Sequence, residues 1–420
     1  MHKLKKWIGA WALIAPLWLD GGGITLYEVG SSDVGLASAG WSARADEPST
    51  AFTNPAGMSR FTCREVECGA QPLYAHVKFN PNKHTTTHGS KGHASPWIPA
   101  GGAFYVQPIN ERWAFGASVL GYFGAKLNFN PHWVGRYYLT EIILEGFSCV
   151  PAISCKLTDR LSIGGGINAM YGVFKQKAAI NNSIDHLKDG SLKLYDDTVS
   201  WGAILGVLYE WDARTRIGIQ YISEVKLQFH CTPHFYHLGP TLKKALSATG
   251  VLNSRIFLNV NIPQTLICSV YHDLTPALAI MGNVGWQEWS NFQKATIALG
   301  SSSAASLTTI PKYQNTWHAA FGAKYQVRDG IALSLGFAYD SSAVSAQDRT
   351  LDFPVGKQLR YGAGIEWWYR HNLLLGLEYE FQHQGDLQIN VNKGILTGKV
   401  AGKYQNVSAQ FLNFNLQWLF

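Results

Sequence analysis

The chain has 420 residues, of which 15% are charged and 13% aromatic, with 42 glycines and a formal net charge of +7. Its basic residues are dispersed, which argues against a nucleic-acid-binding protein. After the N-terminus no apolar run approaches the roughly 18 residues of a membrane-spanning helix. A Gly-rich, aromatic-rich and charge-poor chain of this kind fits a transmembrane β-barrel, because apolar and polar residues alternate along barrel strands.

Residues 1–21 have the pattern of a secretory signal peptide. Lys3, Lys5 and Lys6 give a positive region, and the apolar residues 7–19 follow it. We expect this segment to be removed on export, although an uncleaved anchor would show the same pattern. The cleavage site stays open.

Residues 22–62 differ from everything after them. They are rich in Gly, Ala and Ser, are centred on Asn54-Pro55-Ala56, and show neither the alternation of a strand nor a helix of convincing period. A compact segment ahead of a closed sheet can plug that sheet. We therefore predict an N-terminal hatch at 22–62 and a barrel domain at 63–420.

Short and long connections alternate along the predicted barrel domain. Short polar turns lie near residues 110–111, 158–160, 212–214, 273–276, 328–330 and 370–372. Longer segments lie near residues 81–95, 131–137, 181–194, 232–255, 293–312, 346–354 and 392–403. Six short turns and seven long loops predict an all-β, 14-stranded antiparallel transmembrane β-barrel with short periplasmic turns and long outer loops.

Within the segments the hydrophobic period is two. Leu375, Leu377 and Tyr379, for example, alternate with Gly376 and Glu378. A water-soluble β-sandwich gives the same alternation with its apolar face turned inward. Strands longer than the usual five or six residues, with Trp and Tyr near their ends, favour a barrel in the bacterial outer membrane.

A set of short motifs carries a resemblance to a known family. The motifs are Asn54-Pro55-Ala56, Trp97-Ile98-Pro99, Gln107-Pro108-Ile109-Asn110, Trp113-Ala114-Phe115-Gly116-Ala117-Ser118, Trp133-Val134-Gly135-Arg136-Tyr137, Ser223-Glu224-Val225-Lys226, Trp286 to Phe292 and Ala338-Tyr339-Asp340-Ser341-Ser342. In this order they resemble the FadL/TodX family of outer-membrane transporters for hydrophobic compounds. The resemblance covers about 22–420.

The resemblance implies a barrel with a hatch in its lumen and a kink in the third strand that opens a hole in the wall. The kink aligns with Phe123-Gly124-Ala125, and we expect Asn54 to cover the backbone groups that the kink frees. The implied function is passive uptake of long-chain fatty acids or neutral aromatic hydrophobes, released by hatch rearrangement and lateral diffusion. The resemblance implies neither an enzyme nor a cofactor.

Candidate ligand-binding residues follow from the same resemblance. Family members that take fatty acids place an Arg in the fifth strand, where this chain has Ala178. Lys175 and Lys177 lie close by, at positions whose side chains point outward if the alternation persists. Lys312 lies near the position of a second expected basic residue. Recognition of an anionic head group is thus left open.

Aromatic residues of an outer loop are further candidates. Trp133, Tyr137 and Tyr138 could form a hydrophobic landing site, or they could belong to an interfacial aromatic belt.

Other functional sites are disfavoured. His84, His88 and His93, and a second group of His230, Cys231, His234 and His237, have ligand types that bind zinc, but loops of this composition commonly carry solvated His, and we expect no metal. Glu378 and Glu380 share a face that a wet lumen explains without catalysis. The six cysteines allow disulfides without identifying a pair.

Two rival functions remain at this point. A general aqueous porin would have an open lumen, and a barrel lipid hydrolase would need a Ser–His pair on its bilayer-facing surface. As partners we expect a hydrophobic ligand, outer-membrane lipid and the barrel-assembly machinery, which would recognise the C-terminal Phe420, and we expect a monomer.

Overall fold

The computed structural model describes residues 25–248, 252, 255–298, 312–394 and 396–420. The predicted signal peptide lies outside these residues. Among the residues that are described, no helix is long and apolar enough to cross a membrane.

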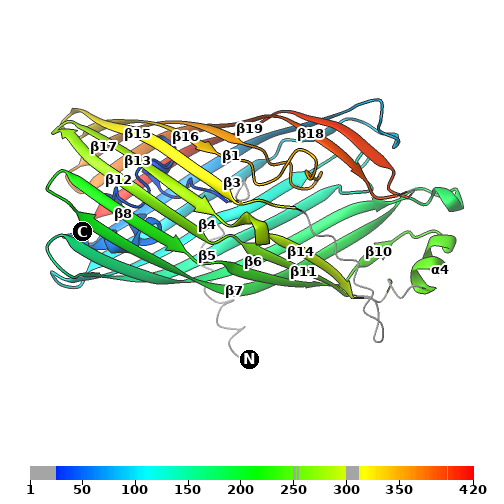
Figure 1. The fold of residues 1–420 in the computed structure, drawn as a ribbon, viewed down its shortest axis with the longest axis horizontal. Helices are drawn as coiled ribbons and strands as arrows, with labels where there is room; N and C mark the ends of the chain where they lie inside the picture. The colour runs from blue at the N-terminus through cyan, green and yellow to red at the C-terminus, as the bar shows by residue number, and fades with distance from the viewer. Residues whose placement is uncertain (1–24, 249–251, 253–254, 299–311, 395) are drawn as a thin grey trace.

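Fourteen antiparallel strands form a closed ring (Figure 1). They are β1 (Glu65–Pro81), β3 (Trp97–Pro108), β4 (Trp113–Asn128), β5 (Glu141–Lys156), β6 (Leu161–Ile180), β7 (Gly190–Glu210), β8 (Thr215–Ile222), β12 (Thr265–Thr275), β13 (Leu278–Gln287), β15 (Thr316–Arg328), β16 (Ile331–Asp340), β17 (Gln358–Arg370), β18 (Leu373–Asn392) and β19 (Lys399–Leu419). The last strand, β19, pairs with β1, and β7 pairs with β8, so the ring closes on itself. The predicted 14-stranded barrel is confirmed.

All six predicted short turns join ring strands at the end of the barrel that carries the C-terminus (Figure 1). The opposite end carries the long loops, which hold η2 (Ser183–Asp185), β10 (His234–Tyr236) and α4 (Pro240–Ala248), while β2 (Gly92–Ala94) adds to β1. A separate three-stranded sheet continues three ring strands toward this loop end. It consists of β9 (Val225–Cys231), β11 (Arg255–Ile262) and β14 (Gln293–Ala298), and η4 (Trp289–Asn291) precedes β14.

The two faces of the ring follow the predicted alternation. On β18, Leu377 and Tyr379 are exposed to the outside, whereas Glu378 and Glu380 are buried inside. An apolar outer skin with a polar interior is the arrangement that lipid requires, because closure pairs the strand backbones and leaves only side chains to meet the acyl chains. The soluble sandwich is therefore excluded.

Residues 25–62, the described part of the predicted hatch, lie inside the end of the barrel that carries the short turns, and we call them the hatch (Figure 1). It contains three short helical turns, α2 (Ser31–Gly35), α3 (Thr50–Thr53) and η1 (Pro55–Arg60). Sequence periodicity did not predict them, because elements of four to six residues are too short to show a period. Contacts with the barrel wall must supply the stability that such short turns lack by themselves.

Glycines on the inner face of the wall let the hatch backbone approach closely. A Cβ atom added to Gly336 would lie 1.9 Å from the carbonyl of Leu36, and one added to Gly218 would lie 1.8 Å from the carbonyl oxygen of Ser42. Both distances are far below contact distance. The hatch thus rests directly on the wall backbone at these positions, and any larger residue there must push it away.

We predict that Gly336→Ala displaces the hatch and raises ion conductance in planar bilayers, because the displaced segment no longer fills the lumen. Gly165→Ala on β6 is the matched control, since its added methyl would meet no atom closer than 3.4 Å. Equal conductance of the two variants would contradict this account of the hatch seat.

Candidate functional site

The ladder between β3 and β4 ends partway along the wall. Its last pair is Gly102 with Leu120, whereas β4 continues to Asn128 in register with β5. A bulge lies between Gly121 and Phe123, at the point where the pairing with β3 ends. Beyond the bulge, no described strand pairs with the β3-facing edge of β4.

Hatch residues cover the beginning of this edge. Thr25 forms an antiparallel bridge with Phe123, and the amide of Leu26 donates to the carbonyl of Tyr122 at 2.8 Å. A buried backbone group left without a partner costs about 1–3 kcal/mol. The start of the hatch therefore closes the wall break. The predicted opening at Phe123-Gly124-Ala125 lies at and directly after this break.

Asn54 lies against a different strand. Its Nδ2 donates to the carbonyls of Ser42 at 2.6 Å and Val207 at 3.0 Å, while its Oδ1 accepts from the amide of Ala56 at 3.2 Å. The expectation that Asn54 covers the freed groups of the kinked strand is wrong, because its amide is used by β7 and by the hatch itself. Asn54, Pro55 and Ala56 as the gate stay a prediction.

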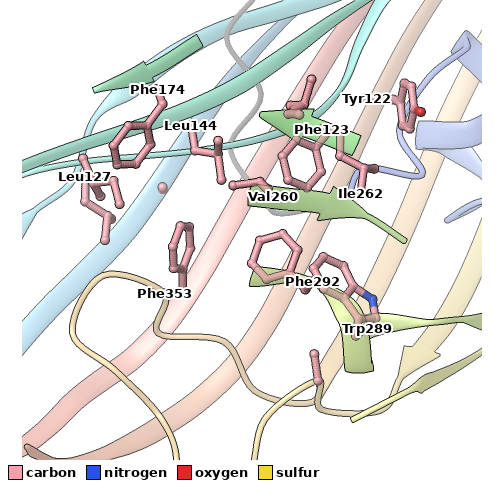
Figure 2. Close-up of a cluster of buried hydrophobic side chains, with 14 of the residues drawn as sticks. Tyr122, Phe123, Leu127, Leu144, Phe174, Val260, Ile262, Trp289, Phe292 and Phe353 are labelled. Atoms are coloured by element: carbon pink, nitrogen blue, oxygen red, sulfur yellow. The ribbon is translucent and has the colours of Figure 1, made fainter. Parts of the chain in front are cut away.

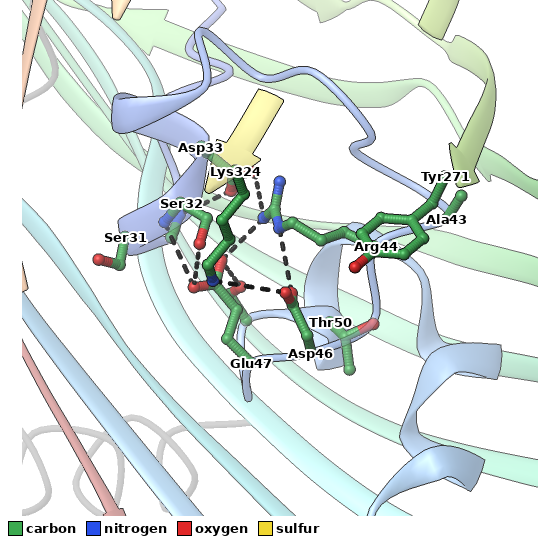
Figure 3. Close-up of polar contacts among 12 residues, drawn as sticks. Ser31, Ser32, Asp33, Ala43, Arg44, Asp46, Glu47, Thr50, Tyr271 and Lys324 are labelled. Atoms are coloured by element: carbon green, nitrogen blue, oxygen red, sulfur yellow. Dashed lines mark hydrogen bonds and ion pairs between the residues drawn. The ribbon is translucent and has the colours of Figure 1, made fainter. Parts of the chain in front are cut away.

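A buried charge cluster holds the hatch together (Figure 3). The guanidinium of Arg44 lies 2.7 Å from Asp33, 2.8 Å from Glu47 and 3.2 Å from Asp46. Arg44 has a side-chain exposure of only 2%. Because all three carboxylates come from the hatch, this guanidinium fixes the path of the chain from α2 to α3.

The same cluster fastens the hatch to the wall. Lys324 on β15 lies 3.6 Å from Asp46 and 2.7 Å from Glu366 on β17. The hydroxyl of Ser32 donates to Glu47 at 3.0 Å and lies 3.2 Å from Glu366. Charged side chains of two barrel strands and the hatch therefore form one network, which has to be broken before the hatch can leave.

Burial changes the acidity of this cluster. Burial raises the pKa of Asp33 to about 6, although Arg44 opposes the rise. Burial alone would raise the pKa of Asp46 too, but Lys324 and Arg44 together hold it below its ordinary value. The pKa values of Asp33 and Asp46 are thus shifted in opposite directions, so Asp33 takes up a proton at a higher pH than Asp46.

A second network joins Glu28 and Ser38 of the hatch to the barrel wall. Arg360 on β17 lies 2.6 Å from Glu28 of the hatch and 2.9 Å from Asp340. The Nδ1 of His318 lies 2.8 Å from Asp340, and its Nε2 lies 3.2 Å from the hydroxyl of Ser38.

This Ser–His–Asp order is the one that hydrolases use, but all three residues are buried inside the barrel. The hydroxyl of Ser38 donates to the carbonyl of Ala37, and the ring of Tyr27 stacks on His318 at 4.2 Å. These two contacts lie inside the barrel, so the hydroxyl of Ser38 is not at a surface that a lipid could reach. We interpret the group as a contact between hatch and wall.

A cluster of buried apolar side chains, which we call the chamber, lies beside the kinked part of β4 (Figure 2). Its side chains come from kinked β4, from β6, from the three-stranded sheet and from the loop after β16. Labelled members are Phe123, Phe174, Val260, Phe292 and Phe353. The ring centroids of Phe123 and Phe292 are 6.1 Å apart. The chamber is thus lined by aromatic and aliphatic groups that suit a hydrophobic molecule.

The protein's own side chains fill most of this chamber. A pocket of about 70 Å³ lies between Ala75, Leu127, Phe353 and Ala409, next to the part of β4 that extends past its ladder with β3. Ligand pockets usually measure roughly 300–1,000 Å³. The pocket described here is therefore smaller than a usual ligand pocket, and a larger ligand would fit at this place only after the surrounding side chains move.

The candidate landing residues serve the loop structure. Trp133 is fully buried, stacks on Phe129 at 4.0 Å and donates its indole N–H to the carbonyl of Leu139 at 2.8 Å. The hydroxyl of Tyr137 donates to Asp189 at 2.9 Å, and that of Tyr138 donates to the carbonyl of Gly398 at 2.6 Å.

An interfacial position does not fit the buried Trp133, which forms a core for the outer loops. The role of these aromatic residues in ligand binding stays a prediction.

The candidate lysines do not face the chamber. Lys175 and Lys177 each lie 2.6 Å from Glu141 on β5, on the outward side of the wall, while Ala178 is buried inside. Lys312 is exposed just before β15. If these lysines contact ligand, they do so outside the chamber, and that role stays a prediction.

In the described part of the chain, no group of three or more His, Cys, Asp or Glu side chains is arranged to hold a metal ion. All six cysteines are free thiols.

Sequence reasoning missed both charge networks, although one signal was present. Asp340, Arg360 and Glu380 occupy inward positions of strands whose other inward residues are mostly small or neutral. Charged residues at inward positions of neighbouring strands indicate a charged partner inside the barrel. The positions of their hatch partners could not be read in this way, because the hatch has no period.

Comparisons with known proteins agree with this geometry. The family model described as "Outer membrane protein transport protein (OMPP1/FadL/TodX)" matches residues 14–420. Outer membrane protein P1 of Haemophilus influenzae is 26% identical over 403 residues, covering 85% of this chain and 84% of that protein. The long-chain fatty acid transport protein of Escherichia coli K12 is 25% identical over 408 residues, covering 88% and 89%.

Solved structures show the same fold. A FadL homologue from Pseudomonas aeruginosa has a TM-score of 0.83 at 21% identity and covers 94% of this chain and 99% of its own. The toluene transporter TodX of P. putida has a TM-score of 0.67 at 14% identity, with the same coverage. At these identities the likeness concerns the fold alone.

We predict that Arg44→Gln lowers the free energy of unfolding by about 3–5 kcal/mol, because it leaves the buried carboxylates of Asp33 and Glu47 without the guanidinium that pairs with them. Thermal unfolding in detergent measures the effect. Arg60→Gln is the matched control, since Arg60 has a single, partly exposed partner in Glu210 and should cost about 1 kcal/mol or less. Equal losses in the two variants would refute the special role of Arg44.

We also predict that docking of the hatch weakens as the pH rises from about 4 to about 6. The pKa of Asp33 is higher in the docked hatch than its ordinary value of 3.8, so docking takes up a proton in this interval. Hydrogen exchange of hatch amides, corrected for intrinsic rates, measures docking. Asp33→Asn should remove the dependence, and its persistence in that variant would assign it to another group.

Proposed function

Because the chain belongs to the outer membrane protein transport family (OMPP1/FadL/TodX), we propose that it is a passive transporter that takes hydrophobic compounds through the bacterial outer membrane and releases them sideways. The family consists of transport proteins and not of enzymes. The barrel described above places this chain in the same membrane.

One observation carries the proposed mechanism. The hatch covers the wall break through the contacts of Thr25 and Leu26 with β4, so the plug of the lumen is also the cover of the lateral opening. Movement of the hatch would therefore open the side of the chamber that faces the hatch and expose the edge of β4 in the same step. A ligand released in this way could pass beside Gly124 into the outer leaflet.

The gate would work near Asn54. Its side chain joins the hatch to the carbonyl of Val207 on β7, and Pro55 fixes the backbone that follows. A small shift of Asn54-Pro55-Ala56 would break the bond to β7 while η1 stays folded. Rearrangement of this segment is the step that we assign to release.

The substrate class follows from the chamber and from the relatives. A chamber of aromatic and aliphatic side chains favours apolar molecules, each buried methylene contributing about 0.8 kcal/mol. Relatives are named for long-chain fatty acids and for toluene. We propose a fatty acid or a neutral aromatic compound as ligand. The ligand would first adsorb near Trp133, Tyr137 and Tyr138. If it has an anionic head group, Lys175, Lys177 or Lys312 would attract that group to the outer surface. The concentration gradient of the ligand and its transfer into apolar surroundings would drive the passage, without a coupled energy source.

We propose two further partners of the barrel. Lipid of the outer membrane would cover the apolar skin. The barrel-assembly machinery would bind the C-terminal Phe420, whose exposed ring stacks on Trp418 at 5.0 Å. We also propose a monomer, because the pairing of β19 with β1 and of β7 with β8 closes the ring within one chain.

We predict that Gly124→Arg lowers the initial rate of oleate or toluene uptake at least tenfold, because a long charged side chain would occupy the lateral route. Uptake into cells that produce equal amounts of folded barrel measures the rate. Asn128→Arg is the control, since Asn128 is exposed at the outer end of the same strand. If both variants take up these probes at the wild-type rate, the lateral route is wrong.

A further inference from the structure

Three neighbouring strands of the barrel are interrupted at the same height. β8 and β9 are separated by Ser223 and Glu224, β11 and β12 by Pro263 and Gln264, and β13 and β14 by residues 288–292. The pieces beyond the interruptions, β9, β11 and β14, pair only with one another. We call this three-stranded sheet the panel.

The panel has two side boundaries, which we call free because no described ladder crosses either of them. No described ladder joins β9 to β7 or β14 to β15, although β7 continues past the interruption in register with β6. Along the β7 side, the amide of His230 donates to the carboxylate of Asp196 at 2.6 Å. The side boundaries of the panel are thus held by far fewer hydrogen bonds than an ordinary barrel strand, so little has to be broken to move them.

The interruptions reverse the two faces of the sheet. Below them, on β8, Ile219 is exposed to the outside and Gln220 is buried inside. Above them, on β9, Leu227 and Phe229 are buried inside, whereas Lys226 is 65% exposed. An apolar inner face and a polar outer face suit a wall that stands above the acyl chains and encloses an apolar space.

The panel also leans into the barrel. A Cβ atom added to Gly172 on β6 would lie 2.7 Å from the side chain of Leu227, and one added to Gly202 on β7 would lie 2.8 Å from Val225. The rings of Phe229 and Phe174 are 5.7 Å apart. β9 therefore rests on the inner face of the neighbouring wall and takes up part of the chamber.

A row of polar side chains crosses the interruptions. The hydroxyl of Tyr221 donates to Gln264 at 2.7 Å, and the amide of Gln264 donates to Glu288 at 2.6 Å. These residues come from the three interrupted strands and form a hinge line. Such a line can stay intact while the panel above it turns.

We propose that the panel is the movable wall of the chamber, which swings outward on the hinge line to admit an apolar chain or ring that then binds against Leu227, Phe229 and Val260. The inference rests on the proposed function and names the binding surface and the way in. It accounts for the small volume of the closed chamber, because the side chains that fill it leave with the panel. It also assigns entry and release to different elements, the panel and the hatch.

A disulfide across the free boundary tests the proposal. In a variant without the six native cysteines, Asp196→Cys with His230→Cys places one thiol on each side of the boundary, where the amide of His230 donates to Asp196. The matched control is Gln228→Cys with Asn259→Cys, which joins two directly paired residues on the outer face of the panel and leaves both boundaries free. Formation of each disulfide is checked by mass spectrometry.

The locked variant should take up oleate and toluene at least tenfold more slowly than the control, and a reductant should restore its rate. Equal uptake by the two oxidised variants would overturn the proposal. If the cysteine-free parent takes up neither probe above cells that lack the protein, the proposed function itself has failed.

A labelling experiment tests the panel without transport and applies even if the disulfide does not form. Cys231 is buried on the inner face of β9, and a chain that keeps it as the single cysteine reports on panel opening. Gly172→Leu places a side chain where that of Leu227 now lies, which should push the panel outward. The reaction of Cys231 with a water-soluble maleimide should then be at least fivefold faster. Gly165→Leu, on the same strand but with its nearest neighbours at 3.4 Å, should not speed the reaction. Equal labelling rates in these two variants would show that the panel is fixed.

Discussion

The structure depends on one requirement, that the backbone groups of a wall in lipid have hydrogen-bond partners. Closure of β19 on β1 meets this requirement around the ring. Where β3 and β4 part, the bond from Leu26 to Tyr122 begins to meet it instead. A contact that completes the wall is therefore supplied by a segment that is not part of the wall. This ties the state of the plug to the integrity of the barrel.

Two different kinds of contact hold the plug. Inner-face glycines such as Gly218 and Gly336 bring backbone against backbone, which fixes position but adds little electrostatic energy. Arg44 and Arg360 supply buried ion pairs, which are costly to break but respond to protonation. The fit of the backbone sets where the hatch lies, and the charges set how firmly it is held there.

The fold could be predicted from the sequence because period-two alternation and turn chemistry are local properties. The six short turns and the inward position of Glu378 needed no knowledge of distant residues. The contacts of the hatch could not be predicted in this way, since Ser38 meets His318 and Glu28 meets Arg360 across hundreds of residues. The panel was also missed, because a one-residue change of parity at Ser223 and Glu224 resembles an ordinary loop boundary.

The buried partners of the hatch have a consequence for biogenesis. The N-terminal segment is synthesised first, yet its ion partners lie on β15 and β17, close to the end of the chain. Its docking site is therefore complete only after these late strands have formed, so docking of the leading segment is coupled to completion of the barrel.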